Sequence, residues 1–238
     1  MTQLSKLKII LGIIYMAIVA LVVFLFFYYH IYSYVNADFI KNNRKDIFKF
    51  RDAHILSISI GFFLFCILWV FLLGFGSPLV ILAGFIFGSI WGSIIFLIGG
   101  TVGATLLYIF VNNYFKELVF DYLGTRYKNL TDHFKNNDFS YLLFLRLVPG
   151  IPFQVTNLLP VLFNMKVKNY FFATIIGMAP STIIMVSLIS GISSKVEYGA
   201  DLNFNLLSDP RISIPLAALG AMVLIVNFIK NKFFNNKN

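Results

Sequence analysis

The chain has 238 residues, of which 59% are hydrophobic and 12% are charged, and its mean hydropathy is +0.83. Soluble domains carry about 25% charged residues, so this composition indicates an integral membrane protein. The net charge of +9 could suggest binding to nucleic acid, but the basic residues lie in short loops between apolar segments, as positive-inside loops do. Cys66 is the only cysteine, which excludes an intrachain disulfide and a thiolate metal cluster.

The N-terminal quarter contains two predicted spans with a polar segment between them. Leu7–Tyr29 is too long and too aromatic for a cleaved signal peptide, so we expect a retained helix. Asn36–Asp52 is polar and basic, and Ile55–Leu73 is the second span. No Asp, Glu, Lys or Arg occurs from Ala53 to Phe115, a stretch about three times as long as one transmembrane helix requires.

The next segment is too long for one helix and too short for two complete spans. Its proline and glycines predict a hairpin over Ser77–Trp91, followed by a span over Gly92–Phe115, and one long kinked helix is the alternative. Small residues at steps of four allow helices to approach closely in lipid. The residues predicted to have structural roles here are Pro78, Gly84, Gly88, Gly92, Gly99 and Gly103.

The second half repeats this outline. Lys116–Asp138 is predicted to lie on the membrane surface as an amphipathic segment, and Phe139–Met165 is predicted to form a second hairpin. A span over Tyr170–Gly191 follows, interrupted by Gly177 and Pro180, which we also expect to be structural. Paired hairpins containing glycine and proline are typical of transporters built from inverted repeats.

The C-terminal part contains a mixed loop, Lys195–Arg211, and a last span, Ile212–Ile229, before a basic tail. The predicted fold is therefore an all-α integral membrane protein with about five transmembrane helices and two re-entrant helical hairpins in an inverted repeat. We divide it into residues 1–54, a core of 55–195, and 196–238. The basic loops and tail favour the cytoplasmic side, whereas Lys6 and Lys8 leave the orientation of the N-terminus open.

Arg146 is the only charged side chain between Asp138 and Lys166, and two prolines, Pro149 and Pro152, follow it. A central arginine costs about 2.5–3.5 kcal/mol on membrane-insertion scales, and prolines prevent a helix from continuing through the segment. Two interpretations stay open. Arg146 binds an anionic headgroup through its forked donors, or it reaches the interface or bonds the free carbonyls of its own hairpin.

Three polar residues follow the prolines, namely Gln154, Thr156 and Asn157, and they suit either a polar pore lining or hydrogen bonding within the hairpin. No enzyme motif accompanies them. His30, His54 and His133 are far apart and have no neighbour at metal-ligand spacing. We therefore expect no enzymatic activity, no cofactor and no bound metal.

Two runs of the sequence resemble a known family. Arg146-x-x-Pro149-x-x-Pro152-Phe153 is followed by Asn157 and then by Asn169-Tyr-Phe-Phe-Ala-Thr-Ile-Ile-Gly177-Met-Ala-Pro180. Together with the upstream Pro78 and its glycines, this pattern resembles the VTT domain of the DedA superfamily, which includes the SNARE-associated Golgi protein relatives. The resemblance covers roughly residues 70–195.

This resemblance implies two facing re-entrant hairpins and either lipid flipping or scrambling, or membrane homeostasis linked to the proton-motive force. The chain departs from the bacterial DedA branch in two respects. Acidic residues are missing from the first hairpin region, and Phe153 and Gln154 stand where a second basic residue is often found. Coupling to protons by that route is therefore not expected, and the sequence is closer to the eukaryotic-like branch.

The predicted function is flipping, scrambling or homeostatic transport of a phospholipid or lipid phosphate, with the two hairpin tips meeting at the midplane. A structural or assembly protein that transports nothing is the alternative. We expect membrane lipids as partners, with an anionic headgroup as the ligand, no nucleic acid, and a location in the cell membrane. The predicted substrate-binding residues are Arg146, Pro149, Pro152, Gln154 and Asn157.

Overall fold

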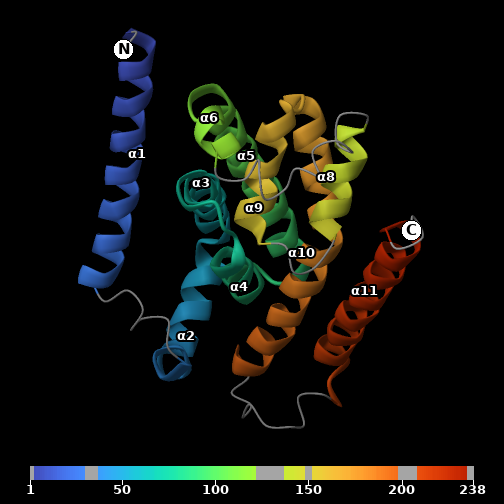
Figure 1. Ribbon diagram of the computed structural model, residues 1–238. Helices are drawn as coiled ribbons and strands as arrows, with labels where there is room; N and C mark the ends of the chain where they lie inside the picture. Colours follow the sequence, from blue (N-terminus) through green and yellow to red (C-terminus); the bar gives the residue numbers. More distant parts are fainter. Residues whose placement is uncertain (1–2, 30–36, 122–136, 148–151, 198–207, 235–238) are drawn as a thin grey trace. The chain divides into compact units, whose positions relative to one another are not determined.

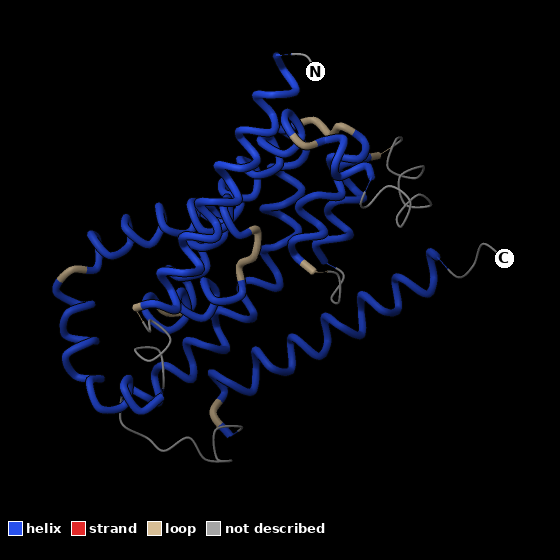
Figure 2. Tube along the Cα trace, turned by 60° about the vertical axis from the view of Figure 1, so that its left-hand side comes forward, coloured by secondary structure: helices blue, strands red, loops and turns tan. Residues whose placement is uncertain are grey.

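The computed structural model describes residues 3–29, 37–121, 137–147, 152–197 and 208–234, and within these ranges all regular structure is helical (Figures 1 and 2). The chain forms two compact units, Met1–Ile55 and Leu56–Asn238. The predicted division into three parts remains a prediction.

The first unit contains α1, Gln3–Tyr28, and α2, Ala37–Ala53. Helix α2 is amphipathic, and its Phe48 is buried beneath the guanidinium of Arg51, 4.7 Å from the ring centroid. His54 follows α2, and its ring stacks on Phe50.

The second unit contains three helices that are long and apolar enough to cross a membrane: Ile55–Leu73, Ser89–Tyr114 and Val167–Lys195. On the first of these, every fourth side chain from Leu56 to Leu68 is exposed and apolar, as expected of a face in contact with lipid. The helices of this unit are α3 (Ile55–Leu73), α4 (Ser77–Phe87), α5 (Ser89–Tyr114), α6 (Lys116–Val119), α8 (Asp138–Leu147), α9 (Phe153–Leu158), the 3-10 helix η3 (Leu159–Phe163), α10 (Val167–Glu197) and α11 (Pro210–Phe234).

Helices α4 and α5 form a hairpin that turns at Gly88, whose φ of 78° suits glycine. A Cβ on Gly92 would collide with the backbone of Ala83, so the two helices run back along each other and are not one long kinked helix. The predicted boundary at Gly92 is wrong, since α5 begins at Ser89 and continues unbroken to Tyr114. The second arm of the hairpin is thus the first part of the span itself.

The other predicted glycines allow close approach to neighbouring helices. A Cβ on Gly84 would lie 2.6 Å from the carbonyl oxygen of Val186 in α10. Gly99 and Gly103 face α3, and a Cβ on Gly103 would lie 2.6 Å from the carbonyl oxygen of Ile67. The glycine pattern therefore places α4 against α10, and α5 against α3.

The second predicted hairpin consists of α8, then residues 148–151 outside the described ranges, then α9 and η3. Of the predicted surface segment Lys116–Asp138, only α6 and a few flanking residues are described.

The predicted interruption of the next span is wrong, because α10 is continuous through Gly177 and Pro180. Proline removes one backbone donor, and neighbouring groups in transmembrane helices commonly accommodate such a loss. Pro180 is exposed.

Helix α11 returns along the end of α10. A Cβ on Gly191 would lie 2.5 Å from the carbonyl oxygen of Arg211, and Lys195 forms an ion pair with Asp209 at 2.7 Å. The helix begins at Pro210 and extends to Phe234, so it is longer at both ends than the predicted span of Ile212–Ile229.

Candidate functional site

Arg146 lies near the end of α8, where this helix packs directly on α10. A Cβ on Gly177 would lie 2.6 Å from the Cβ of Arg146 and 3.1 Å from the carbonyl oxygen of Leu143. Any larger residue at position 177 would therefore push α8 away from α10. The conformational freedom of glycine is not needed here, and what matters is the missing side chain.

Arg146 is 8% exposed, and all of its described hydrogen-bond acceptors are neutral. Nη1 donates to Thr156 Oγ1 at 2.9 Å, and Nη2 donates to Asn157 Oδ1 at 2.7 Å. Nη2 also lies 3.1 Å from the Tyr170 hydroxyl and 3.2 Å from Thr174 Oγ1. None of these four partners carries a negative charge, so they leave the positive charge uncompensated.

The donors of Arg146 are unevenly used. A guanidinium has five N–H groups, two of them on Nη2, and three acceptors compete for those two. Among the described residues, the buried Nε has no hydrogen-bond partner. The ring of Phe153 lies 4.7 Å from the guanidinium carbon and offers a weaker, cation–π contact.

Asn157 and Tyr170 hold this cluster to the rest of the unit. The Asn157 amide donates to the carbonyl oxygen of Gly74 at 3.1 Å, in the turn between α3 and α4. Tyr170 donates to Asn157 Oδ1 at 3.2 Å and stacks on Tyr108 of α5, with ring centroids 4.5 Å apart. Tyr108 in turn donates to the carbonyl oxygen of Met165. Hydrogen bonds and the ring stack thus join the α3–α4 turn, α5, α8, α9 and α10 around one cation.

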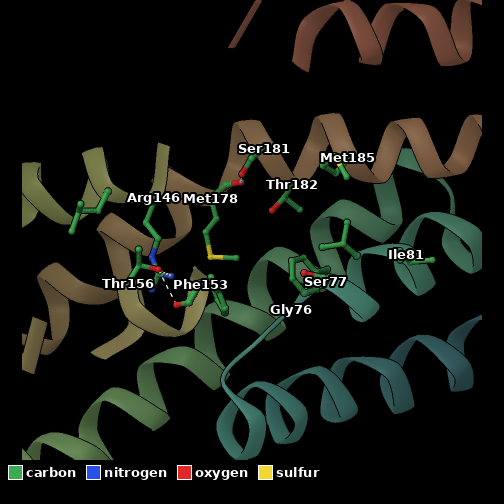
Figure 3. A pocket seen from close by; sticks show the side chains of 13 residues that line it. Gly76, Ser77, Ile81, Arg146, Phe153, Thr156, Met178, Ser181, Thr182 and Met185 are labelled. Carbon is green, nitrogen blue, oxygen red and sulfur yellow. Dashed lines mark hydrogen bonds between the residues drawn. The ribbon is translucent and has the colours of Figure 1, made fainter. Parts of the chain in front are cut away.

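A cavity of about 290 Å³ extends from Arg146 between α4 and α10 (Figure 3). At its inner end, Arg146 lies close to Thr156 and Phe153. Its α10 wall consists of Met178, Ser181, Thr182 and Met185, which share one face at helical spacing. The other described lining residues are Gly76, Ser77, Val80, Ile81, Phe96 and Leu145, and no acidic side chain is among the described lining residues.

The structure brings together only two of the five predicted substrate-binding residues, Arg146 and Asn157. Pro152 is exposed at the N-terminus of α9, and Gln154 is exposed two residues further on. Pro149 lies outside the described residues. Pro152 and Gln154 therefore flank the cluster in sequence and are not among the described hydrogen-bond partners of Arg146.

The prediction omitted Tyr170 and Thr174, although both directly contact Arg146. They are four residues apart on α10, so they share one helix face. Both lie in the motif that ends with Gly177 and Pro180. Their spacing of four residues is the signal in the sequence that could have identified them.

The first hairpin turn and the arginine lie at different levels along α10. Gly88 faces Ser190, at 3.7 Å from its would-be Cβ, whereas Arg146 bonds Tyr170 and Thr174. The 16 residues between Thr174 and Ser190 correspond to about 24 Å of helix. The expectation that the two hairpin tips meet at the midplane stays a prediction, because the turn of the second hairpin, residues 148–151, lies outside the described residues.

The fold and the site together define an all-helical integral membrane protein with a buried, uncompensated arginine at the end of a largely apolar cavity. The family model of the VTT domain matches residues 73–191, half of the chain, and the chain belongs to this family. The match contains the α4–α5 hairpin, Arg146 and all four of its hydrogen-bond partners.

Curated relatives include proteins named Transmembrane protein 41B. The protein from Gallus gallus is 23% identical over 196 residues, which cover 79% of this chain and 71% of the relative. The human protein is 21% identical over the same length, covering 79% and 66%, and that of Xenopus laevis is 21% identical over 168 residues, covering 68% and 59%. The chain thus spans about two thirds of these relatives. No solved structure matches it.

Proposed function

We propose that this protein moves phospholipids or lipid phosphates across a membrane, and that Arg146 binds the phosphate during passage. The observation that carries the proposal is a guanidinium, 8% exposed and bonded only to neutral groups, at the inner end of an apolar cavity. A buried charge without a counter-charge is costly, and a bound anion would lower that cost.

The lining of the cavity favours an amphiphile over a small soluble anion. Away from Arg146 the walls are mainly apolar, and Ile81 at one edge is 51% exposed. Exposed apolar side chains on a membrane protein face lipid, so the cavity opens beside a surface of that kind. A lipid would place its phosphate at Arg146 and its chains along Val80, Ile81 and Met185.

The proposed topology has five spans, α1, α3, α5, α10 and α11, with α4 and α8 as re-entrant helices. Helix α4 has 11 residues and α8 has 10, which gives about 16 Å and 15 Å of helix, against about 30 Å of hydrocarbon. Helices α1 and α11 have 26 and 25 residues, long enough to cross. The proposed location is the cell membrane, and the proposed partners are its lipids.

Labelling of introduced cysteines would test this topology. The single native cysteine, Cys66, is fully buried, and Cys66→Ala provides a background for single cysteines at the start of α4 and just past the turn that follows it. Under the proposal, cysteines at positions 77 and 90 do not label from opposite faces of the membrane.

A structural role is the second candidate, favoured by the four hydrogen bonds of Arg146 and its tight contact with Gly177. The two functions are distinguished in liposomes that contain purified protein and phospholipids carrying a fluorescent headgroup. An impermeant quencher removes only the outer label from protein-free vesicles, and transport exposes the inner label as well.

The expected result is transport by the natural protein and by Arg211→Ala, an exposed arginine outside the cavity, and none by Arg146→Ala. Absence of transport by a well-folded natural protein would leave the structural role as the better account.

A further inference from the structure

Helix α4 begins at the wall of the cavity without a capping side chain among the described residues. Its N-cap residue is Gly76, and Pro78 lies in its first turn. Backbone N–H groups of a first helical turn have no partner within the helix, and a helix N-terminus carries about half a positive elementary charge. Gly76 and Ser77 both line the cavity (Figure 3), so this positive end lies at its surface.

Helix α4 runs parallel to α10. Gly84 packs against Val186, and Gly88 packs against Ser190. The residue numbers of the contacts therefore rise in the same direction along both helices. The start of α4 and Arg146 belong to the same cavity, since Gly76, Ser77 and Arg146 all line it. Asn157 makes the connection directly, since it bonds both Arg146 and the carbonyl oxygen of Gly74, two residues before Gly76.

The guanidinium of Arg146 is the other positive group at this cavity, besides the N-terminus of α4. Arg146 is more than nine-tenths buried, lines the same cavity and, among the described residues, has an Nε without a partner. Two positive groups therefore line one cavity, and none of its described lining residues is a carboxylate. They repel each other unless an anion lies between them, and a helix N-terminus with an arginine is a common way of binding phosphate.

We infer that the uncapped N-terminus of α4 and Arg146 form one two-sided phosphate site, in which the backbone of α4 binds one side of the phosphate and the guanidinium binds the other. The inference rests on the proposed function and adds a second binding element to it. The phosphate belongs to an amphiphile whose apolar part lies along Val80, Ile81 and Met185. The first half of the VTT domain thus contributes to binding through its backbone.

Ser77 offers a test that leaves Arg146 untouched. Ser77→Asp places a carboxylate beside the free N–H groups, where it replaces the ligand anion, and Ser77→Asn is the neutral reference of nearly the same size. The probes are dihexanoyl phosphatidylglycerol and inorganic phosphate, titrated calorimetrically into the full chain in detergent. We expect the Asp variant to bind the short-chain lipid about tenfold more weakly than the Asn variant. Its ligand-free thermal stability should be no lower, because Asp is favourable in a first helical turn.

The other possible results separate the two-sided site from the proposed function. Equal affinity of the Asp and Asn variants, with loss of binding in Arg146→Ala, would overturn the two-sided site and leave the proposed function standing. Failure of the natural protein to bind either probe would overturn both. Binding of inorganic phosphate as tightly as the short-chain lipid would overturn the lipid as the source of the phosphate. Binding that depends on Ser77 without lipid movement in liposomes would support the site and count against transport.

Discussion

Asn157 accepts a 2.7 Å hydrogen bond from Arg146, and this contact fixes the arginine of α8 to α9. The other end of the same amide donates to Gly74. Asn157 thus determines both where the guanidinium lies and how the turn before α4 is held. Because the Asn157 amide is neutral, it holds the guanidinium without compensating its charge.

Replacing Asn157 with Asp should abolish lipid movement while preserving the fold. The new carboxylate would form an ion pair with Arg146 that offsets the lost bond to Gly74, and it would compete with a ligand anion. The measurement is headgroup-labelled lipid transport per amount of folded protein, with Asn113→Asp at an exposed position of α5 as the control. Unchanged transport by the Asn157→Asp variant would argue against an anion at Arg146.

Arg146→Lys should also lose transport, although it keeps the charge. A lysine cannot reproduce the planar contacts that reach Thr156 and Asn157 together. Arg146→Ala should lower the stability by about 1–3 kcal/mol, because buried acceptors lose their donor, and the protein that remains folded should be inactive. Thermal unfolding in detergent, beside transport, separates these effects. A loss of activity that only tracks the loss of folded protein would favour the structural role.

Tyr170→Phe should reduce transport several-fold, because it removes a hydroxyl that contacts both Arg146 and Asn157. The stack on Tyr108 is kept. Tyr108→Phe is the matched control, because it removes one hydroxyl from the same ring pair, away from Arg146, and its hydrogen bond to Met165 contributes about 1 kcal/mol. Equal transport by the two variants would show that the Tyr170 hydroxyl has no part in the site.

Gly103→Ala should destabilise the protein by about 1–3 kcal/mol, because the added methyl group would collide with the backbone of Ile67. Gly61→Ala, in α3, is the control, since a Cβ there meets nothing within 4 Å, and it should stabilise α3 by up to about 1 kcal/mol. Thermal unfolding of both variants in one detergent measures the difference. Identical melting temperatures would exclude the close packing of α5 on α3.

The contact between the end of α10 and the start of α11 should weaken in acid. The hydrogen bond from Lys195, assisted by the backbone N–H of Arg211, lowers the pKa of Asp209 below its ordinary value. A carboxyl whose pKa is lower in the folded state stabilises the fold above its unfolded pKa, and that contribution is lost as the pH falls through the folded value.

Between neutral pH and about pH 3, Asp209→Asn should therefore remove part of the acid-induced fall in melting temperature. Asp52→Asn, at an exposed position paired with Arg51 in the other unit, serves as the comparison. The same pH dependence in the natural protein and in the Asp209→Asn variant would contradict a role for this pair. The expected effect is small, because the pair lies near the surface.

The sequence by itself determined the membrane class, the helical segments and the unusual status of Arg146. Apolar runs of about 20 residues have few alternatives to a membrane helix, and a lone charge within them stands out from composition alone. The glycine steps likewise predicted close packing, although not which helix each glycine faces. Local sequence also misplaced the boundary at Gly92 and the break at Pro180, because neighbouring helices allow a transmembrane helix to continue where local signals predict an end.

Only the tertiary structure decided which residues surround Arg146. Tyr170 and Thr174 are 24 and 28 residues away in sequence, Gly74 is joined through Asn157, and the start of α4 comes from the other half of the domain. These groups meet because glycines at 84 and 177 let α4 and α8 approach α10 closely. A hydrogen bond depends on distances of a few ångströms, and those distances are set by how helices pack, which no local pattern of residues specifies.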